Sequence, residues 1–378
     1  MKKKLLLNYV YWPPVGHVLE AAKYAKGFYD ANNNLEISVL LNKDSPNEMI
    51  KLCPWIKKTY SIDLSDSSKG LAKIPKKWDY VVIDKRARDF YSMSSELKGF
   101  HQDFFEKVNA KLWKGYTNFW KVGEKSPLKY IPNSKVALKQ GPKPRDFMKK
   151  KLKSKKNICI MLGGSGGPGK YPSIESWIYI LKELKENFPK YDLILTGVLK
   201  NNSGRTFTKS YGSKEIGKLK KEIPEIKDMY NIGLMNQVAL VEACDLFISP
   251  HTGFGFIAPL VDTPWLAISG SNWPEYFLND VSFYSAMDGL KHYPGYCFLN
   301  QPTKDQKERL RRYFGFDNET MKKRSKDILF GAKILLNEKI SYEQSVKVHL
   351  KNLKKFKFKL SSFFFFDDAI KGKDFKKW

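Results

Sequence analysis

Two glycine-rich loops and two histidines are the parts of this chain best suited to hold an anion or to move a proton. The first loop lies within 249–270, after a short apolar run that favours a buried strand. Its central residues are His251, Thr252, Gly253, Phe254 and Gly255. Glycine has no Cβ, so the backbone at Gly253 and Gly255 can turn sharply and leave the N–H groups of the next helix open to a ligand. This pattern predicts an anion-binding turn.

The second loop covers 163–170 and contains five glycines and a lysine. Lys170 is followed by Tyr171 and not by Ser or Thr, and the glycine spacing also differs, so the loop is not a Walker A loop. The alternative is a flexible loop with an exposed lysine. The residues that we expect to contact a phosphate group are Gly163, Gly164, Ser165 and Lys170.

His17 comes directly after the first predicted strand and its turn, at the start of a predicted helix. An imidazole titrates near neutral pH, so His17 is the best candidate for a general base. It could instead hydrogen-bond a substrate without moving a proton, or be a loop histidine with no role. For His251 two interpretations also stay open, an anion ligand at a helix start and a structural histidine in a turn.

Short apolar runs and amphipathic segments alternate along most of the chain. Predicted strands lie at 4–11, 35–41, 59–64, 78–84, 157–162, 191–197, 229–232, 245–249 and 265–268. Predicted helices lie at 18–29, 47–52, 173–188, 214–221, 236–243 and 254–261. Such alternation is typical of an α/β fold with parallel sheets. The aromatic stretch at 87–133 favours helix, and the basic, proline-containing stretch at 139–156 is typical of a linker between two domains.

The charge balance predicts an anionic partner. The 378 residues include 67 Lys and Arg against 39 Asp and Glu, which gives a net charge of +28. This excess suits phosphorylated substrates, nucleic acid or an anionic membrane surface. The lysines are dispersed and we find no known nucleic-acid-binding motif, so we expect no nucleic-acid partner.

The four cysteines lie far apart in the sequence, at positions 53, 159, 244 and 297. There is no Cys-x-x-Cys and no Cys/His cluster with metal-ligand spacing, so we expect buried thiols, a reducing compartment and no metal site. The apolar run at 5–10 is too short for a signal peptide, and no run approaches a membrane span. These features predict a cytoplasmic protein, at most associated with the inner face of the membrane.

The order of these segments over roughly 4–275 resembles the GT-B glycosyltransferases, and most closely glycosyltransferase family 9, the heptosyltransferase-like group. The residues that match the family's motifs are Gly16, Lys170, Tyr171, Pro172, Thr196, Gly197, Thr252, Gly253, Ala258, Thr263 and Pro264. The chain departs from the family at His17, His251 and Phe256, which stand where the family has Asp, Asp and His. These departures put the donor sugar and the subfamily in question.

The resemblance implies a GT-B fold in which two Rossmann-like domains face each other across a cleft. It implies an acceptor domain at 1–145, a donor domain at 155–335 and a basic aromatic tail at 336–378. The four phenylalanines at 363–366 could dock on a membrane, but we favour a tail that packs back on the first domain.

The resemblance also implies an inverting, metal-independent glycosyltransferase without a cofactor, which moves a sugar from a nucleotide diphosphate to a hydroxyl of a glycan or glycolipid. In this interpretation His17 is the base. The donor-binding residues are Gly163, Gly164, Ser165, Lys170, Thr196, Gly197, His251, Thr252, Gly253 and Phe254. The alternatives are a sugar-nucleotide epimerase of the same fold and a basic nucleic-acid-binding protein.

Overall fold

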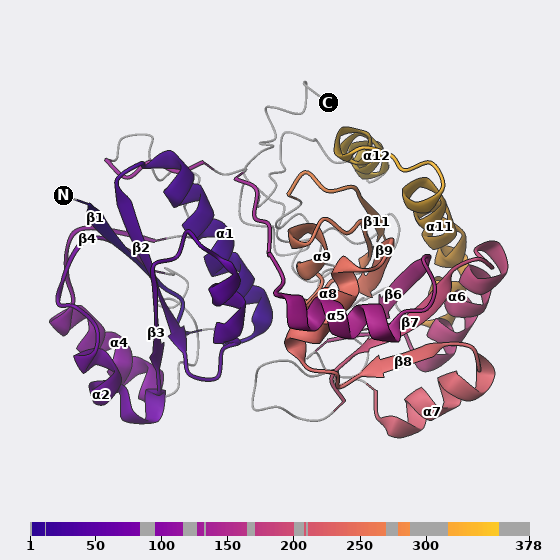
Figure 1. Ribbon diagram of the computed structural model, residues 1–378, viewed down its shortest axis with the longest axis horizontal. Helices are drawn as coiled ribbons and strands as arrows, with labels where there is room; N and C mark the ends of the chain where they lie inside the picture. Colours follow the sequence, from indigo (N-terminus) through magenta and orange to yellow (C-terminus); the bar gives the residue numbers. More distant parts are fainter. Residues whose placement is uncertain are drawn as a thin grey trace, which may run out of the picture. The chain divides into compact units, whose positions relative to one another are not determined.

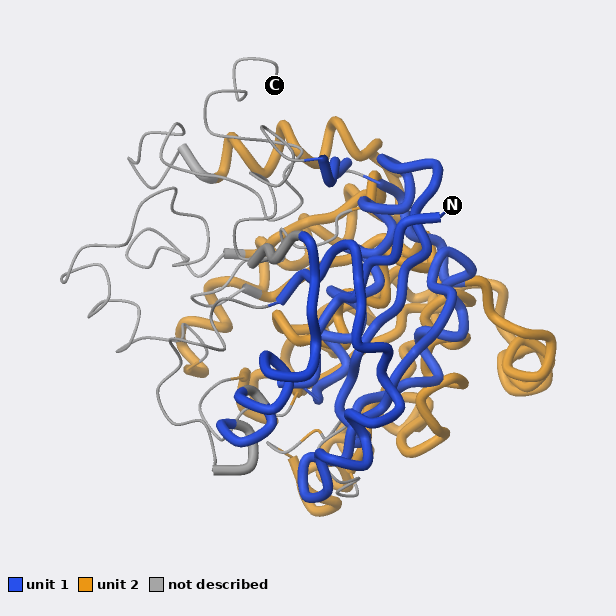
Figure 2. Tube along the Cα trace, turned by 90° about the vertical axis from the view of Figure 1, so that its left-hand side faces the viewer, with its two compact units in different colours: residues 1–138, 203–205 blue, residues 139–202, 206–378 orange. Residues whose placement is uncertain are grey.

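The computed structural model contains two compact α/β units, the first within residues 1–138 and the second beginning at Lys139 (Figure 1, Figure 2). Each unit has its own parallel sheet with helices on both faces, so each can be described by itself. The structure describes residues 2–11, 13–83, 95–115, 127–131, 134–164, 171–199, 208, 211–269, 279–287 and 317–354.

The first unit is built on a five-stranded sheet in the order β3-β2-β1-β4-β5, and every neighbouring pair is parallel. The strands are β1 Lys3–Asn8, β2 Leu35–Asn42, β3 Lys58–Ile62, β4 Lys77–Ile83 and β5 Asn109–Gly115. Leu5, Leu6 and Leu7 are all fully buried although successive side chains point to opposite faces, because helices cover both faces of the sheet.

Helices lie on both faces of this first sheet. The helical segments of the unit are α1 Val15–Ala31, η1 Asn47–Leu52, η2 Leu64–Asp66, α2 Ser67–Ala72 and α4 Ser95–Lys107. Helix α1 contacts β2 and η1, whereas α2 packs against α4 and β3. Alternate strand residues such as Leu6 and Val81 form one apolar cluster with Phe100 and Phe104 of α4.

The segment at 127–131 packs against α1 at Gly27. A Cβ on Gly27 would lie 2.3 Å from the Tyr130 ring and 2.5 Å from the Ile131 carbonyl oxygen. The Tyr130 ring is 4.9 Å from the ring of Phe28, and Lys23 Nζ donates to the carbonyl of Ser134 over 2.8 Å. Glycine at position 27 is therefore required for this close approach.

The second unit contains a six-stranded parallel sheet in the order β11-β10-β9-β6-β7-β8. The strands are β6 Asn157–Met161, β7 Asp192–Gly197, β8 Lys227–Tyr230, β9 Leu246–Pro250, β10 Trp265–Ser269 and β11 Phe283–Met287. Counted within the unit this is the Rossmann order 3-2-1-4-5-6, whose direction reverses between β6 and β9. In open sheets of this kind ligands bind at such a point, beyond the carboxyl ends of the strands.

Two sets of helices flank this second sheet. The helices are α5 Pro142–Lys151, α6 Ile174–Asn187, α7 Ser213–Glu222, α8 Leu234–Glu242, α9 Ile257–Leu260, α11 Asn318–Leu336 and α12 Tyr342–Lys354. Helix α6 contacts α7 and α11, while α8 contacts α5 and α9 (Figure 1). Ile158, Ile160 and Leu195 share one apolar cluster with Trp177 of α6 and Ile328 of α11.

Three sequence predictions need correction. The predicted linker at 139–156 contains helix α5 and belongs to the second unit. The helix forms there because Pro142 suits the first helical turn. Met148 of α5 is buried where the helix packs on α8. The stretch predicted as helical at 87–133 contains strand β5 after α4, since its backbone completes the sheet beside β4.

The described part of the predicted tail lies in the second unit, where α12 packs on β11 and Ser345 Oγ accepts from the backbone N–H of Phe283. This placement differs from the predicted packing on the first domain, because apolar residues of α12 such as Val346 find a partner in the adjacent strand. The phenylalanines at 363–366 lie outside the described residues.

The described cysteines, Cys53, Cys159 and Cys244, are free and buried, as predicted; position 297 lies outside the described residues. Burial raises the pKa of Cys53 to about 12, so this thiol stays protonated and unreactive at neutral pH. Within the described ranges, every helix is too short or too polar to cross a bilayer.

Two helical glycines should respond in opposite ways to the same substitution. We expect Gly27→Ala to lower the free energy of unfolding by about 1–3 kcal/mol, because the added methyl group meets the Tyr130 ring and a backbone carbonyl. Gly217→Ala in α7 is the control. A Cβ there has no heavy atom within 4 Å, so alanine should stabilise the helix by about 0.5–1 kcal/mol. Urea unfolding measures both, and equal effects would contradict the packing described for Gly27.

Candidate functional site

The two predicted ligand loops begin side by side at the carboxyl edge of the second sheet. Strands β6 and β9 are paired neighbours, and their last residues are Met161 and Pro250. The loops that follow them touch, since a Cβ on Gly164 would lie 3.1 Å from Cγ2 of Thr252. The structure therefore brings residues from both loops to the point where the strand order reverses.

Two buried aromatic side chains, Tyr211 and Trp177, hold the ends of the loop at 163–170 together. The Tyr211 hydroxyl lies 3.3 Å from the carbonyl oxygen of Leu162, at the start of the loop, and donates to the carbonyl of Pro172 at its end. Trp177 Nε1 donates to Leu162 over 3.0 Å and to the Tyr211 hydroxyl over 3.2 Å. Burial raises the pKa of Tyr211, so its hydroxyl stays protonated and remains a donor.

Position 163 requires a glycine because the start of the loop packs directly against the rings of Tyr171 and Tyr211. A Cβ at position 163 would lie 2.9 Å from both Tyr171 Cδ2 and Tyr211 Cε2. Gly164 is also crowded, with the Tyr171 hydroxyl 3.0 Å from a Cβ at that position. Ser165 and Lys170, the other residues predicted in this loop, lie outside the described residues.

The loop after β9, at 251–256, differs from its prediction in the extent of the following helix and in hydrogen bonding. The helix predicted at 254–261 is limited to α9, four residues from Ile257. The backbone N–H of Gly255 donates to Thr252, to the carbonyl at 2.9 Å and to Oγ1 at 3.1 Å. A Cβ on Gly255 would lie 2.3 Å from the Trp265 ring, so this glycine serves packing rather than a ligand. The N–H of Gly255 is therefore used inside the turn.

Three side chains of this loop point toward protein rather than toward solvent. Phe254 is 4% exposed and its ring is 6.1 Å from that of Phe247. His251 Nε2 is buried, and the imidazole packs edge-on against Phe256 with centroids 5.6 Å apart. This burial lowers the pKa of His251 from 6.5 to about 4, so the ring is neutral at pH 7. Gly253 is half-buried and keeps its backbone near the surface.

Thr196 and Gly197 end the neighbouring strand β7 and lie in the core. The Thr196 side chain is 0% exposed. Gly197 has φ +147°, and a Cβ there would lie 2.6 Å from the Tyr230 ring, so only glycine fits. The Gly197 carbonyl accepts from Gln237 Nε2 at 2.6 Å and from the backbone N–H of Asn231 at 3.0 Å. The Gly197 carbonyl therefore has structural contacts, whereas Thr196 is buried, and their donor-binding roles stay predictions.

His17 lies in the first turn of α1 and belongs to a hydrogen-bonded group of side chains. Its Nδ1 is 3.0 Å from Glu20 Oε2, and the other carboxylate oxygen of Glu20 accepts from the Tyr24 hydroxyl at 3.1 Å. The side chain of His17 is 33% exposed and that of Glu20 only 7%. A carboxylate that accepts from Nδ1–H leaves Nε2 as the unprotonated nitrogen of a neutral imidazole.

The structure brings Gly163, Gly164 and Thr252 together, with His251 and Gly253 in the same loop, and it puts His17 in the first unit. Sequence analysis missed the side chains that support them, namely Glu20, Tyr24, Trp177 and Tyr211. For Glu20 a signal was available, because it comes three positions after His17 and residues at that spacing share one face of a helix. Among the described residues no group of three or more His, Cys, Asp or Glu side chains could bind a metal ion.

Comparisons with known proteins identify the fold. No protein-family model matches the chain, and no curated protein matches it. The structure is similar to a glycosyltransferase of family 9 from Veillonella parvula, with TM-score 0.61 and 12% identity over 89% of this chain and 98% of that one. It is also similar to the E. coli ADP-heptose lipopolysaccharide heptosyltransferase II, with TM-score 0.52 and 11% identity over 88% and 99% of the two chains.

A third solved structure, the E. coli heptosyltransferase WaaC with ADP, has TM-score 0.50 and 9% identity over 75% of this chain and 93% of that one. The chain thus has the α/β fold of the GT-B glycosyltransferases and resembles family 9. The predicted fold class is confirmed.

The buried imidazole of His251 should make folding sensitive to acid. In the unfolded chain a histidine binds its proton near pH 6.5, but in the folded protein His251 does so only near pH 4. The free energy of unfolding that depends on this neutral ring is fully present above pH 6.5 and is lost as the pH falls toward 4, by at most about 1.4 kcal/mol per pH unit. We expect His251→Gln to lose less stability than the natural chain between pH 7 and pH 4 in urea unfolding. An identical loss in both proteins would contradict this.

Proposed function

We propose that this protein is a glycosyltransferase that moves a sugar from a nucleotide diphosphate to a hydroxyl group of a glycan or glycolipid. The strongest support is the pair of glycine-rich loops that meet at the switch point of the second sheet, in a chain with the fold of known glycosyltransferases. A diphosphate fits such a place, because backbone N–H groups beyond the carboxyl ends of parallel strands can bind its oxygens.

The donor would bind to the second unit. Gly163 and Gly164 carry no side chain where the loop begins and let the backbone pack against Tyr171 and Thr252, and Thr252 holds the facing turn. We assign Lys170 the role of cation for the leaving diphosphate, so that charge is stabilised without a metal ion. Sugar-nucleotide specificity is left to experiment, since His251 and Phe256 stand where family 9 has Asp and His.

His17 is the proposed general base. The acceptor hydroxyl gives its proton to Nε2 of His17 while its oxygen forms a bond to the anomeric carbon of the sugar. The bond from that carbon to the diphosphate breaks, and the diphosphate leaves with the electron pair. Attack opposite the leaving group inverts the anomeric configuration. Glu20 accepts from Nδ1–H and so favours the tautomer in which Nε2 carries no proton.

Two variants in α1 test these roles. His17→Ala should lower kcat by about 10²- to 10⁴-fold with the fold intact, because no base then accepts the proton. Glu20→Gln should lower kcat by about tenfold or more with little change in KM, because an amide can donate to Nδ1 and favour the wrong tautomer. Glu36→Gln, in strand β2, is the matched control and should leave kcat unchanged. Full turnover of the His17 variant would exclude it as the base.

Thermal unfolding with ADP, UDP, GDP, CMP and their common sugar conjugates tests the donor. A ligand at 100 times its Kd stabilises the folded chain by about 2.7 kcal/mol, which is a shift of a few degrees. We expect one nucleotide diphosphate to stabilise the protein and Lys170→Ala to weaken the effect. Absence of any shift would contradict a donor site.

Product analysis with the nucleotide sugar that binds, with and without an acceptor, then distinguishes transfer from epimerisation. Free nucleotide that accumulates only when an acceptor is added supports a transferase. A sugar that changes configuration without an acceptor supports the epimerase alternative.

A further inference from the structure

The most basic part of the described chain is the segment that leads through α5 into strand β6. From Lys143 to Lys156 the sequence has eight basic residues and one acidic residue, Asp146. The basic residues are Lys143, Arg145, Lys149, Lys150, Lys151, Lys153, Lys155 and Lys156. All eight are exposed, so their charge acts on the solvent side of the second unit.

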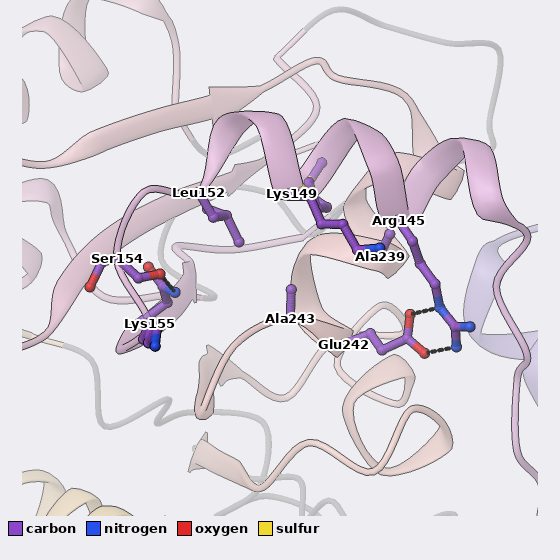
Figure 3. Close-up of a pocket in the computed structure, with 10 residues that line it drawn as sticks. Arg145, Lys149, Leu152, Ser154, Lys155, Ala239, Glu242 and Ala243 are labelled. Atoms are coloured by element: carbon purple, nitrogen blue, oxygen red, sulfur yellow. Dashed lines mark hydrogen bonds and ion pairs between the residues drawn. The ribbon is translucent and has the colours of Figure 1, made fainter.

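Helix α5 is fixed in place by its other side. Met148 is 2% exposed where α5 packs on α8, and Arg145 forms a two-point contact with Glu242 of α8, at 3.1 and 2.5 Å (Figure 3). The lysines are thus held on a rigid support.

Elsewhere in the unit several exposed lysines are ion-paired, which reduces their field. Lys182 pairs with Glu222, Lys218 with Glu175 and Lys220 with Asp228. The segment 143–156 also has ion pairs, Lys149 with Asp146 at 3.6 Å and Arg145 with Glu242. Its eight basic residues against one acidic residue still give it a denser excess of positive charge than these regions have.

A pocket of about 400 Å³ opens within this basic segment, between α5 and α8 (Figure 3). Its wall is apolar at Leu152, Ala239 and Ala243, while Lys149 and Lys155 also line it. Asn157 at its base is 2% exposed, and its Oδ1 is buried with no hydrogen-bond partner among the described residues. The pocket therefore combines cations, an acceptor and apolar surface, which suits an anionic group that carries a hydroxyl and an apolar chain.

The pocket is separate from the loops of the candidate donor site. Asn157 is the first residue of β6, whereas Gly163 and Gly164 follow its last residue, Met161. The pocket thus lies toward the amino end of the strand and the loops lie beyond its carboxyl end.

We propose that the segment 143–156 docks the protein on an anionic lipid membrane, with a phosphoglycerol headgroup in the pocket beside Lys149 and Lys155. Clusters of four to eight basic residues on a helix bind anionic lipid surfaces, and each residue near the surface adds attraction. The hydroxyl of the headgroup donates to Asn157 Oδ1, and the apolar wall contacts the beginning of the acyl chains. The proposal does not rest on the transferase reaction, because binding to vesicles needs no turnover.

A membrane fits these residues better than a nucleic acid does. Single-stranded nucleic acid is held by aromatic side chains on which bases stack, and the pocket wall is aliphatic. Nucleic-acid binding is kept as an outcome of the test.

The test is sedimentation of the full chain with phosphatidylcholine vesicles that contain no, or about one third, phosphatidylglycerol, at low and at physiological salt. One variant carries Lys149→Gln, Lys151→Gln and Lys155→Gln. The control carries Lys214→Gln, Lys218→Gln and Lys221→Gln in α7, which removes the same number of exposed lysines from the same unit. Urea unfolding checks that both variants are folded.

We expect the natural chain and the α7 variant to bind vesicles only when phosphatidylglycerol is present, and more weakly at higher salt. The variant with substitutions at Lys149, Lys151 and Lys155 should bind about 10- to 100-fold more weakly than the α7 variant. Equal weakening of both variants, or no binding of the natural chain at low salt, would overturn the proposal. Binding to a random oligonucleotide without binding to vesicles would also overturn it and favour the nucleic-acid alternative. Nucleotide-induced stabilisation is measured separately, so failure here leaves the transferase proposal standing.

Discussion

The hydroxyl of Tyr211 is the contact on which the candidate donor loop depends. It lies between the carbonyls of Leu162 and Pro172, which begin and end the loop, and Trp177 from α6 donates to it from the other side. Because the group is buried, an unmade hydrogen bond here would leave polar atoms without water and would cost about 1–3 kcal/mol. Tyr211 and Trp177 thus fix the distance between the ends of the loop. The sequence of the loop is rich in glycine and has by itself little preference for one conformation.

The glycines of the chain serve different purposes that look alike in the sequence. Gly163 makes room for two tyrosine rings, Gly255 lies flat against Trp265, and Gly197 has a backbone conformation that side chains rarely adopt. Gly163 and its neighbour Gly164 lie where their loop meets Thr252 of the loop after β9, at the reversal of strand order, which is the position that favours a ligand. The proposed chemistry accordingly rests on the place of Gly163 and Gly164 in the sheet and not on the number of glycines nearby.

The two units differ in the charged groups that the two proposals use. In the first unit His17 is hydrogen-bonded to the carboxylate of Glu20, which also accepts from Tyr24, and the proposed role of His17 is to accept one proton. In the second unit the positive charge is concentrated in the exposed segment 143–156, whose helix is anchored by Met148 and Arg145. A base needs a defined position, whereas attraction to a charged surface needs only density of charge.

The sequence by itself determined the α/β class and most strands and helices, because continuous apolar runs such as Leu5–Leu7 can only be buried strands between helices. It also pointed to the two loops and to His17. Strand β5 was missed because its two lysines interrupt the apolar pattern, and α5 was taken for a linker because its burial comes from α8. The roles of Tyr211, Glu20 and the pocket beside Asn157 were decided only by the tertiary structure. Hydrogen bonds between distant segments and the burial of a single ring depend on which surfaces meet, and a local pattern of residues does not encode that.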